Sequence, residues 1–164
     1  MLDLDLVVNS IPISLNKSYL KIIETKKLKK VGYLLKKQMK LEKDESAYWV
    51  KNPSIKCFNS DFKLYPTIGI SNINARQMFG TSAYFYFKND LLIKVSFQLI
   101  QNQFFAEKGL QLFRSICGKI YGIPKVYGNV NDVNKFAEWE DDNSILITEL
   151  SDCSKHFYVH WILK

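Results

Sequence analysis

Two histidines and three cysteines are the residues of this chain best suited to metal or nucleophilic chemistry. His156 and His160 are four residues apart, a spacing that on a helix would let both bind one metal ion. The surrounding sequence alternates like a β-strand, however, and four residues of a strand span about 13 Å, too far for one metal. Cys57, Cys117 and Cys153 are widely spaced and contain no Cys-x-x-Cys pair, so neither zinc nor a disulfide framework is expected. A cysteine–histidine nucleophile would require a proximity that the sequence does not show.

Carboxylates form the second group of interest. Glu138, Glu140 and Asp142 alternate, and on a regular strand they would share one face and could hold a divalent cation or act as acid and base. A turn at residues 140–143 would break this alternation, and no Asp-x-Asp-x-Asp-Gly loop is present. Nucleophile-elbow, Walker and dinucleotide-binding patterns are also absent from the sequence. We therefore expect no catalytic residues, no cofactor and no metal, and a protein that is not an enzyme.

Charge is strongly segregated along the chain. Ten lysines and two glutamates between Lys17 and Lys43 give a local net charge of +8, whereas residues 132–152 contain seven acids and one lysine, a net of −6. Lysines can neutralise phosphate, and Tyr19 and Tyr33 could stack on bases, so a nucleic-acid partner of residues 17–43 is one hypothesis. The chain has only two arginines, both outside this segment, and base reading usually relies on arginine. A solvated basic face or a protein partner is the alternative.

Length and composition indicate a single domain over residues 1–164, with a subdivision near residues 66–80 as the alternative. The 47% of hydrophobic and 14% of aromatic residues are typical of a folded protein with a sizeable core. The sequence has no run of about 18 apolar residues and no basic, apolar start of a secretory signal, so no membrane span and a cytoplasmic location are expected.

Periodicity predicts an α+β fold: an antiparallel sheet with helices packed on one face, and a C-terminal half of ββαβββ order. The second half contains strands at 81–87 and 91–100, a helix at 103–121 ended by Gly122, and strands at 136–139, 144–150 and 155–163. In the first half, residues 1–6 form a short strand or a frayed end, and short strands are predicted at 47–50, 54–58 and 62–65. Residues 26–43 fit either a helical period or a helix ending at 25–28 followed by a strand from about Val31; we favour the second.

The C-terminal half resembles a known type of small bacterial protein. A Tyr-Gly-x-Pro sequence at 121–124 follows the predicted helix, and Trp139 then begins an acidic hairpin. This order, over residues 81–163, is similar to that of immunity proteins of interbacterial toxin systems and of proteins with a β-lactamase-inhibitor-like fold. The resemblance implies a non-enzymatic protein that binds a cognate toxin or effector. The two charged segments could pair within one molecule or between two copies, so both a monomer and a homodimer are expected alternatives.

The candidate partner-binding residues combine the two charged segments with aromatic side chains that could act as anchors if exposed. An acidic hairpin would suit a basic toxin, and the lysines an acidic one. The predicted residues are Glu138, Trp139, Glu140, Asp141, Asp142, Tyr84, Tyr86, Tyr158, Lys26, Lys27, Lys29 and Lys30.

Overall fold

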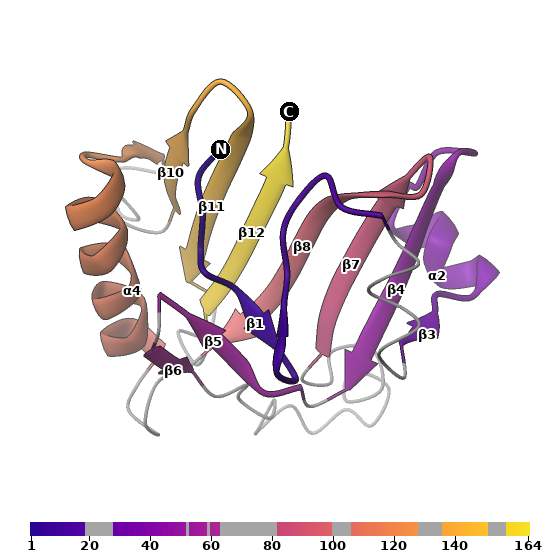
Figure 1. Cartoon of the computed structure of the whole chain (residues 1–164), viewed down its shortest axis with the longest axis horizontal. Helices are drawn as coiled ribbons and strands as arrows, with labels where there is room; N and C mark the ends of the chain where they lie inside the picture. The colour runs from indigo at the N-terminus through magenta and orange to yellow at the C-terminus, as the bar shows by residue number, and fades with distance from the viewer. Residues whose placement is uncertain are drawn as a thin grey trace.

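The computed structural model describes residues 1–18, 28–51, 53–58, 60–62, 82–99, 106–127, 136–150 and 157–164. Two antiparallel sheets make up most of this structure, and the smaller sheet, the N-terminal segment and the helix α4 (Ala106–Tyr121) lie on the same side of the larger one (Figure 1). The predicted α+β class with an antiparallel sheet is confirmed.

The larger sheet has eight strands in the order β3-β4-β7-β8-β12-β11-β10-β9. In chain order these are β3 (Lys29–Lys30), β4 (Glu45–Lys51), β7 (Ser82–Lys88), β8 (Leu91–Leu99), β9 (Lys125–Tyr127), β10 (Phe136–Glu140), β11 (Ser144–Leu150) and β12 (Phe157–Leu163). Strands from both sides of residues 63–81 therefore pair within one sheet, since β4 lies directly against β7.

Turn chemistry explains the hairpin of β7 and β8. Lys88 pairs with Leu91, and the two residues between them, Asn89 and Asp90, have φ angles of 48° and 62°. Asn and Asp tolerate this left-handed region, which a two-residue loop requires to match the twist of its strands. The loop is one residue shorter than the sequence pattern suggested.

The smaller sheet has the order β2-β1-β5-β6. It contains β1 (Val7–Val8), β2 (Ile11–Pro12), β5 (Ile55–Cys57) and β6 (Ser60–Phe62). Its apolar residues, with those of the preceding segment, complete the core: Leu4 is 0% exposed and Leu6 only 1%. The first six residues are thus neither a strand nor a frayed end, but an ordered segment without ladder pairing that buries its alternate leucines and exposes Met1, Asp3 and Asp5.

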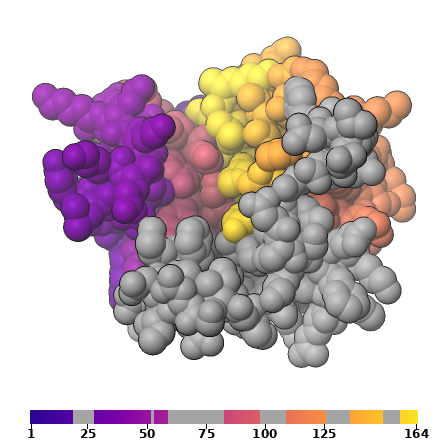
Figure 2. Space-filling model, turned by 180° about the vertical axis from the view of Figure 1, so that it is seen from behind, coloured from indigo at the N-terminus to yellow at the C-terminus, as the bar shows by residue number. Residues whose placement is uncertain are grey.

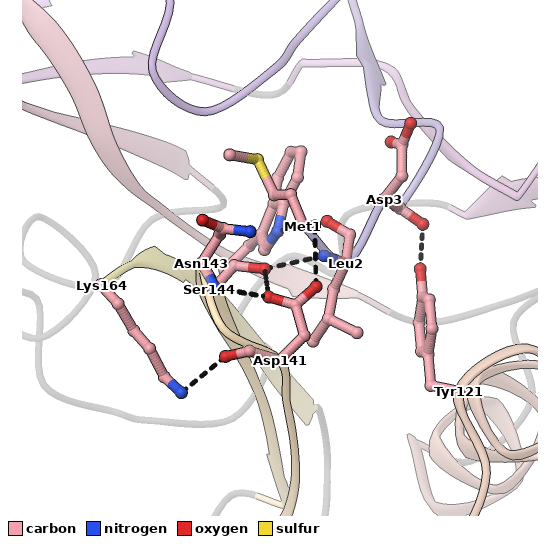
Figure 3. A network of polar contacts seen from close by, with 9 residues as sticks. Met1, Leu2, Asp3, Tyr121, Asp141, Asn143, Ser144 and Lys164 are labelled. Atoms are coloured by element: carbon pink, nitrogen blue, oxygen red, sulfur yellow. Dashed lines mark hydrogen bonds and ion pairs between the residues drawn. The ribbon is translucent and has the colours of Figure 1, made fainter.

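Polar contacts fix the N-terminal segment to three other elements (Figure 3). The backbone amide of Leu2 donates to Ser144 Oγ at 2.8 Å, and Trp161 Nε1 donates to the carbonyl of Leu2 at 3.1 Å. The hydroxyl of Tyr121, at the end of α4, donates to the carbonyl of Asp3. These contacts satisfy the polar groups of a backbone that has no strand partner.

Helix α4 packs its apolar side on the sheet. Phe113 and Cys117 are fully buried, and Arg114 donates from Nε to Thr148 Oγ1 at 3.0 Å, which ties the helix to β11. The helix ends as predicted at Gly122, whose φ of 86° suits glycine. Residues 103–105 of the predicted helix lie outside the described residues.

The structure of residues 28–43 differs from the interpretation that we favoured for residues 26–43. The strand expected from about Val31 is wrong: β3 ends at Lys30, and residues 33–38 form the short helix α2 (Tyr33–Gln38). The helical alternative was therefore right for this stretch. A further strand, β9, was not predicted and pairs with β10. The part of the expected helix before residue 28 lies outside the described residues, as do residues 66–80, where the alternative subdivision was placed.

Candidate functional site

The eight-stranded sheet has a core face and an opposite face, which we call the outer face. Strand residues alternate between the two: in β12, Phe157, Val159 and Trp161 are buried in the core, whereas Tyr158 and His160 are half-buried on the outer face. The outer face lies on the side viewed in Figure 2, where β7, β8 and β12 are seen between residues 28–51 and the strands β10 and β11.

Aromatic and polar side chains are concentrated on the outer face. The ladder register places one row straight across the sheet: Lys29, Trp49, Tyr84, Ser96, His160, Ile147, Glu138 and Lys125. The next positions add Tyr86 and Lys94 on one side of this row and Tyr158 and Glu149 on the other. The structure thus brings together Tyr84, Tyr86 and Tyr158, three of the predicted binding residues, on one face.

A hydrogen-bonded chain crosses four strands at the centre of the outer face. Ser96 Oγ lies 2.9 Å from His160 Nδ1, and His160 Nε2 lies 3.2 Å from Glu149 Oε1. The hydroxyl of Tyr86 shares a hydrogen bond with the side chain of Ser96. The ring of Tyr158 stacks parallel to that of His160, with the centroids 6.2 Å apart. These contacts restrict the rotamers of the side chains that a partner would meet.

Burial perturbs two titratable groups of this cluster. It raises the pKa of Tyr86 to about 12, and the neighbouring Tyr84 adds to the effect. Burial lowers the pKa of Lys94, whereas the charge of Glu149 acts in the opposite direction. The ammonium of Lys94 lies 5.0 Å from the centre of the Tyr86 ring, a cation–π contact that offsets part of its desolvation.

The order Ser96–His160–Glu149 resembles the nucleophile, base and acid of an acyl-transfer relay. Ser96 is 8% exposed and lies within β8, which pairs with β7 on one side and β12 on the other. Backbone amides between two ladders are used by the sheet and cannot form an oxyanion hole. In the described part of the chain, no group of three or more His, Cys, Asp or Glu residues could hold a metal ion.

Two acids of the hairpin between β10 and β11 are paired with cations of the same chain. Glu140 accepts hydrogen bonds from Lys125 and, at 3.1 Å, from Lys164, and Asp141 Oδ2 lies 2.8 Å from the N-terminal ammonium. The cations of Lys125 and Lys164 lower the pKa of Glu140. Acids held in this way are less able to attract a basic partner.

Trp139 is not exposed and therefore cannot act as an aromatic anchor for a partner. It is only 3% exposed, and its Nε1 donates to the carbonyl of Gly122 at 2.9 Å. Of the other acids, Glu138 lies half-buried on the outer face and Asp142 is exposed at the tip of the hairpin. The strand ends at Glu140, so the three-carboxylate face of a continuous strand does not form.

The lysines lie at the opposite edge of the sheet from this hairpin. Lys29 and Lys30 are exposed on β3, and six inter-strand steps separate β3 from β10, about 29 Å along the sheet. The nearby acids Glu42, Asp44 and Glu45 all lie within 4.0 Å of Lys88. The two charged segments therefore do not neutralise each other through the residues described. Lys26 and Lys27 are not among the residues that the structure describes.

Ser96, Glu149 and Trp49 were not predicted as site residues. The available signal was the alternation in residues 157–163, which places Tyr158 and His160 on the non-core face. Their partners lie on other strands, 64 and 11 residues from His160, and could be found only once the strand register was known. Of the cysteines, Cys57 and Cys117 are buried free thiols, and burial raises the pKa of Cys117 to about 12. This disfavours a thiolate nucleophile there; Cys153 is not described.

Comparison with protein-family models, curated proteins and solved structures found no match for this chain. Of the helices in the described residues, none has the length and apolarity needed to cross a membrane.

Proposed function

We propose that this protein is a non-enzymatic binding protein of the immunity type, which binds a toxin or effector protein and blocks its action, and that it does so with the outer face. The observation that carries the proposal is the cluster of Trp49, Tyr84, Tyr86 and Tyr158 beside the Ser96–His160–Glu149 chain. Tyrosine and tryptophan supply large contact areas at low entropic cost and are enriched among residues that dominate binding energy. The hydrogen-bonded chain supports this use because it orders the surface before a partner arrives.

The proposal is tested with the product of the neighbouring gene. We expect that product to arrest growth when expressed alone, and co-expression of this protein to restore growth. A blocking protein acts by stoichiometric binding, so protection in vitro should rise until the two proteins are equimolar and then stop. Protection by far less than an equimolar amount would indicate turnover and would contradict a non-enzymatic role.

Substitutions then locate the surface. We expect Tyr84→Ala and Tyr158→Ala each to raise the Kd of the complex by about thirtyfold, the effect of removing a typical hot-spot residue. The control is Ile123→Ala, which removes an apolar side chain that is 97% exposed just beyond α4. If both tyrosine variants remain folded by circular dichroism and bind with unchanged Kd, the outer face is not the docking surface. If the neighbouring product is neither toxic nor bound, the immunity-type function is wrong.

A further inference from the structure

The strongest unexplained surface feature is a pair of exposed apolar residues within a cluster of lysines. Tyr33 is 79% exposed and Leu34 is 76% exposed, next to each other in the first turn of α2. We call these two residues, together with Lys29, Lys30, Lys37 and Lys40, the basic tip. All four lysines are exposed, and in the described structure none of them has an acidic ion-pair partner.

The basic tip is held firmly although it buries little. Val31 is 6% exposed, and its amide donates to the carbonyl of Ala47 at 2.9 Å, which fixes the start of the tip to β4. The ammonium of Lys29, on β3, lies 5.6 Å from the centre of the ring of Trp49, on β4. Helix α2 itself has no buried residue, so its apolar side chains do not serve the core. Figure 2 shows residues 28–51 projecting at one side of the molecule.

We propose that the basic tip binds the surface of lipid bilayers that contain anionic lipids. Lysines near such a surface gain electrostatic energy, while a tyrosine and a leucine between them can enter the interfacial region. Tyrosine is suited to this region because its ring is apolar and its hydroxyl stays hydrated. The proposal concerns attachment to a lipid surface and does not rest on the protein-binding role of the outer face, which the tip adjoins through Lys29 and Trp49.

Nucleic acid is the competing occupant, and the composition of the tip argues against it. Leu34 has no π-face on which a base could stack, yet it is as exposed as Tyr33. Arginine, the usual residue for bidentate phosphate contacts, is absent from residues 17–43. An exposed aliphatic residue is costly in water and of little use on a polyanion, whereas a bilayer gives it an apolar environment.

The test is co-sedimentation of the full chain with vesicles of phosphatidylcholine alone and of phosphatidylcholine mixed with phosphatidylglycerol. We expect binding to the anionic vesicles only, weakening as salt is raised. Lys37→Gln and Lys40→Gln should each lower the affinity about fivefold, and Leu34→Ser about tenfold because its apolar side chain no longer enters the bilayer.

Two control variants make the result specific. Ile123→Ser removes an apolar residue that is even more exposed, and Lys119→Gln removes an exposed lysine of α4; neither should change vesicle binding. The proposal is overturned if Leu34→Ser binds like the unchanged protein, or if neutral and anionic vesicles bind equally. It is also overturned if a single-stranded oligonucleotide binds more tightly than the vesicles and is unaffected by Leu34→Ser, since the tip would then be a nucleic-acid surface.

Discussion

Replacing Asp141 with asparagine should reveal how far the acidic hairpin serves the fold. One carboxylate oxygen of Asp141 lies 2.8 Å from the N-terminal ammonium, and the other accepts hydrogen bonds from the amides of Asn143 and Ser144, both at 2.8 Å. Asparagine keeps an oxygen for the two amides but removes the charge. Asp141→Asn therefore isolates the ion pair that joins the hairpin to the start of the chain (Figure 3).

The expected magnitude follows from the pKa of this carboxyl group. Burial acts to raise it, but hydrogen bonds from the N-terminus and the two amides, with the ammonium charge, outweigh burial and lower the pKa from 3.8 to about 2. A shift of this size corresponds to about 2 kcal/mol of stability. Because the Asp141 side chain is 31% exposed and its partner 32%, solvent screening reduces the expected loss to about 1 kcal/mol.

The pH dependence has a definite sign. The pKa is lower in the folded state, so the unfolded chain binds more protons between pH 3.8 and about 2. The contribution of Asp141 is complete above the unfolded pKa and disappears as the pH falls through the folded pKa. The difference in unfolding free energy between the unchanged protein and Asp141→Asn should therefore shrink from pH 5 toward pH 2.

The assay is urea unfolding followed by tryptophan fluorescence, on a chain that begins at Met1 with a free amino group. Asp142→Asn is the matched control, because the neighbouring carboxylate is exposed and has no hydrogen bond or ion pair among the described residues. Equal effects of the two substitutions at neutral pH, or a difference that does not shrink in acid, would refute the reasoning.

Two further predictions concern stability. Leu4→Ala should lower the unfolding free energy by about 3 kcal/mol, the cost of a cavity at a fully buried leucine. The control Leu91→Ala, at a residue that is 40% exposed, should lower it by less than about 1 kcal/mol. Urea titration measures both losses, and equal losses would contradict the burial of Leu4. Gly122→Ala should lower the unfolding free energy by about 1 kcal/mol, because an alanine is strained at a φ of 86°. Nothing lies within 4 Å of an added Cβ, so this loss comes from the backbone and not from a clash. Thermal unfolding measures it, and an unchanged Tm would mean that the backbone adjusts without strain.

The second half of the fold could be predicted because its signals are local. Strands β7 and β8 alternate strongly around the Asn89–Asp90 turn, and α4 combines an apolar stripe with Gly122 at its end. The first half has elements of two to seven residues, most of them as short as β3 and α2. Periods cannot be read over such lengths, and the place of Lys29 is set by pairing with Trp49 on another strand rather than by its own propensity.

In the candidate site, too, the local features could be predicted and the contacts between strands could not. Alternation alone places Tyr84 beside Tyr86, and Tyr158 beside His160, each pair on one face of its strand. The contact of His160 with Ser96 depends on the register of β12 against β8, and a slip of one residue would turn His160 into the core. The hydrogen bond of Trp139 could not be foreseen, because its acceptor, the carbonyl of Gly122, is 17 residues away in the chain.

The arrangement of charges bears on the kind of partner that the outer face would accept. Two acids of the hairpin, Glu140 and Asp141, are bound by Lys125, Lys164 and the N-terminal ammonium, so these two contribute little attraction for a partner. The lysines of the basic tip have no such compensation, and they adjoin the outer face at the β3–β4 edge. Among the described residues, four lysines without an acidic partner therefore lie at one edge of the proposed docking surface. A protein that covers Tyr84 and Tyr86 would meet this edge, and electrostatic complementarity requires it to be acidic there. Association should then slow as salt is added, while the dissociation rate, which depends on the aromatic contacts, changes little.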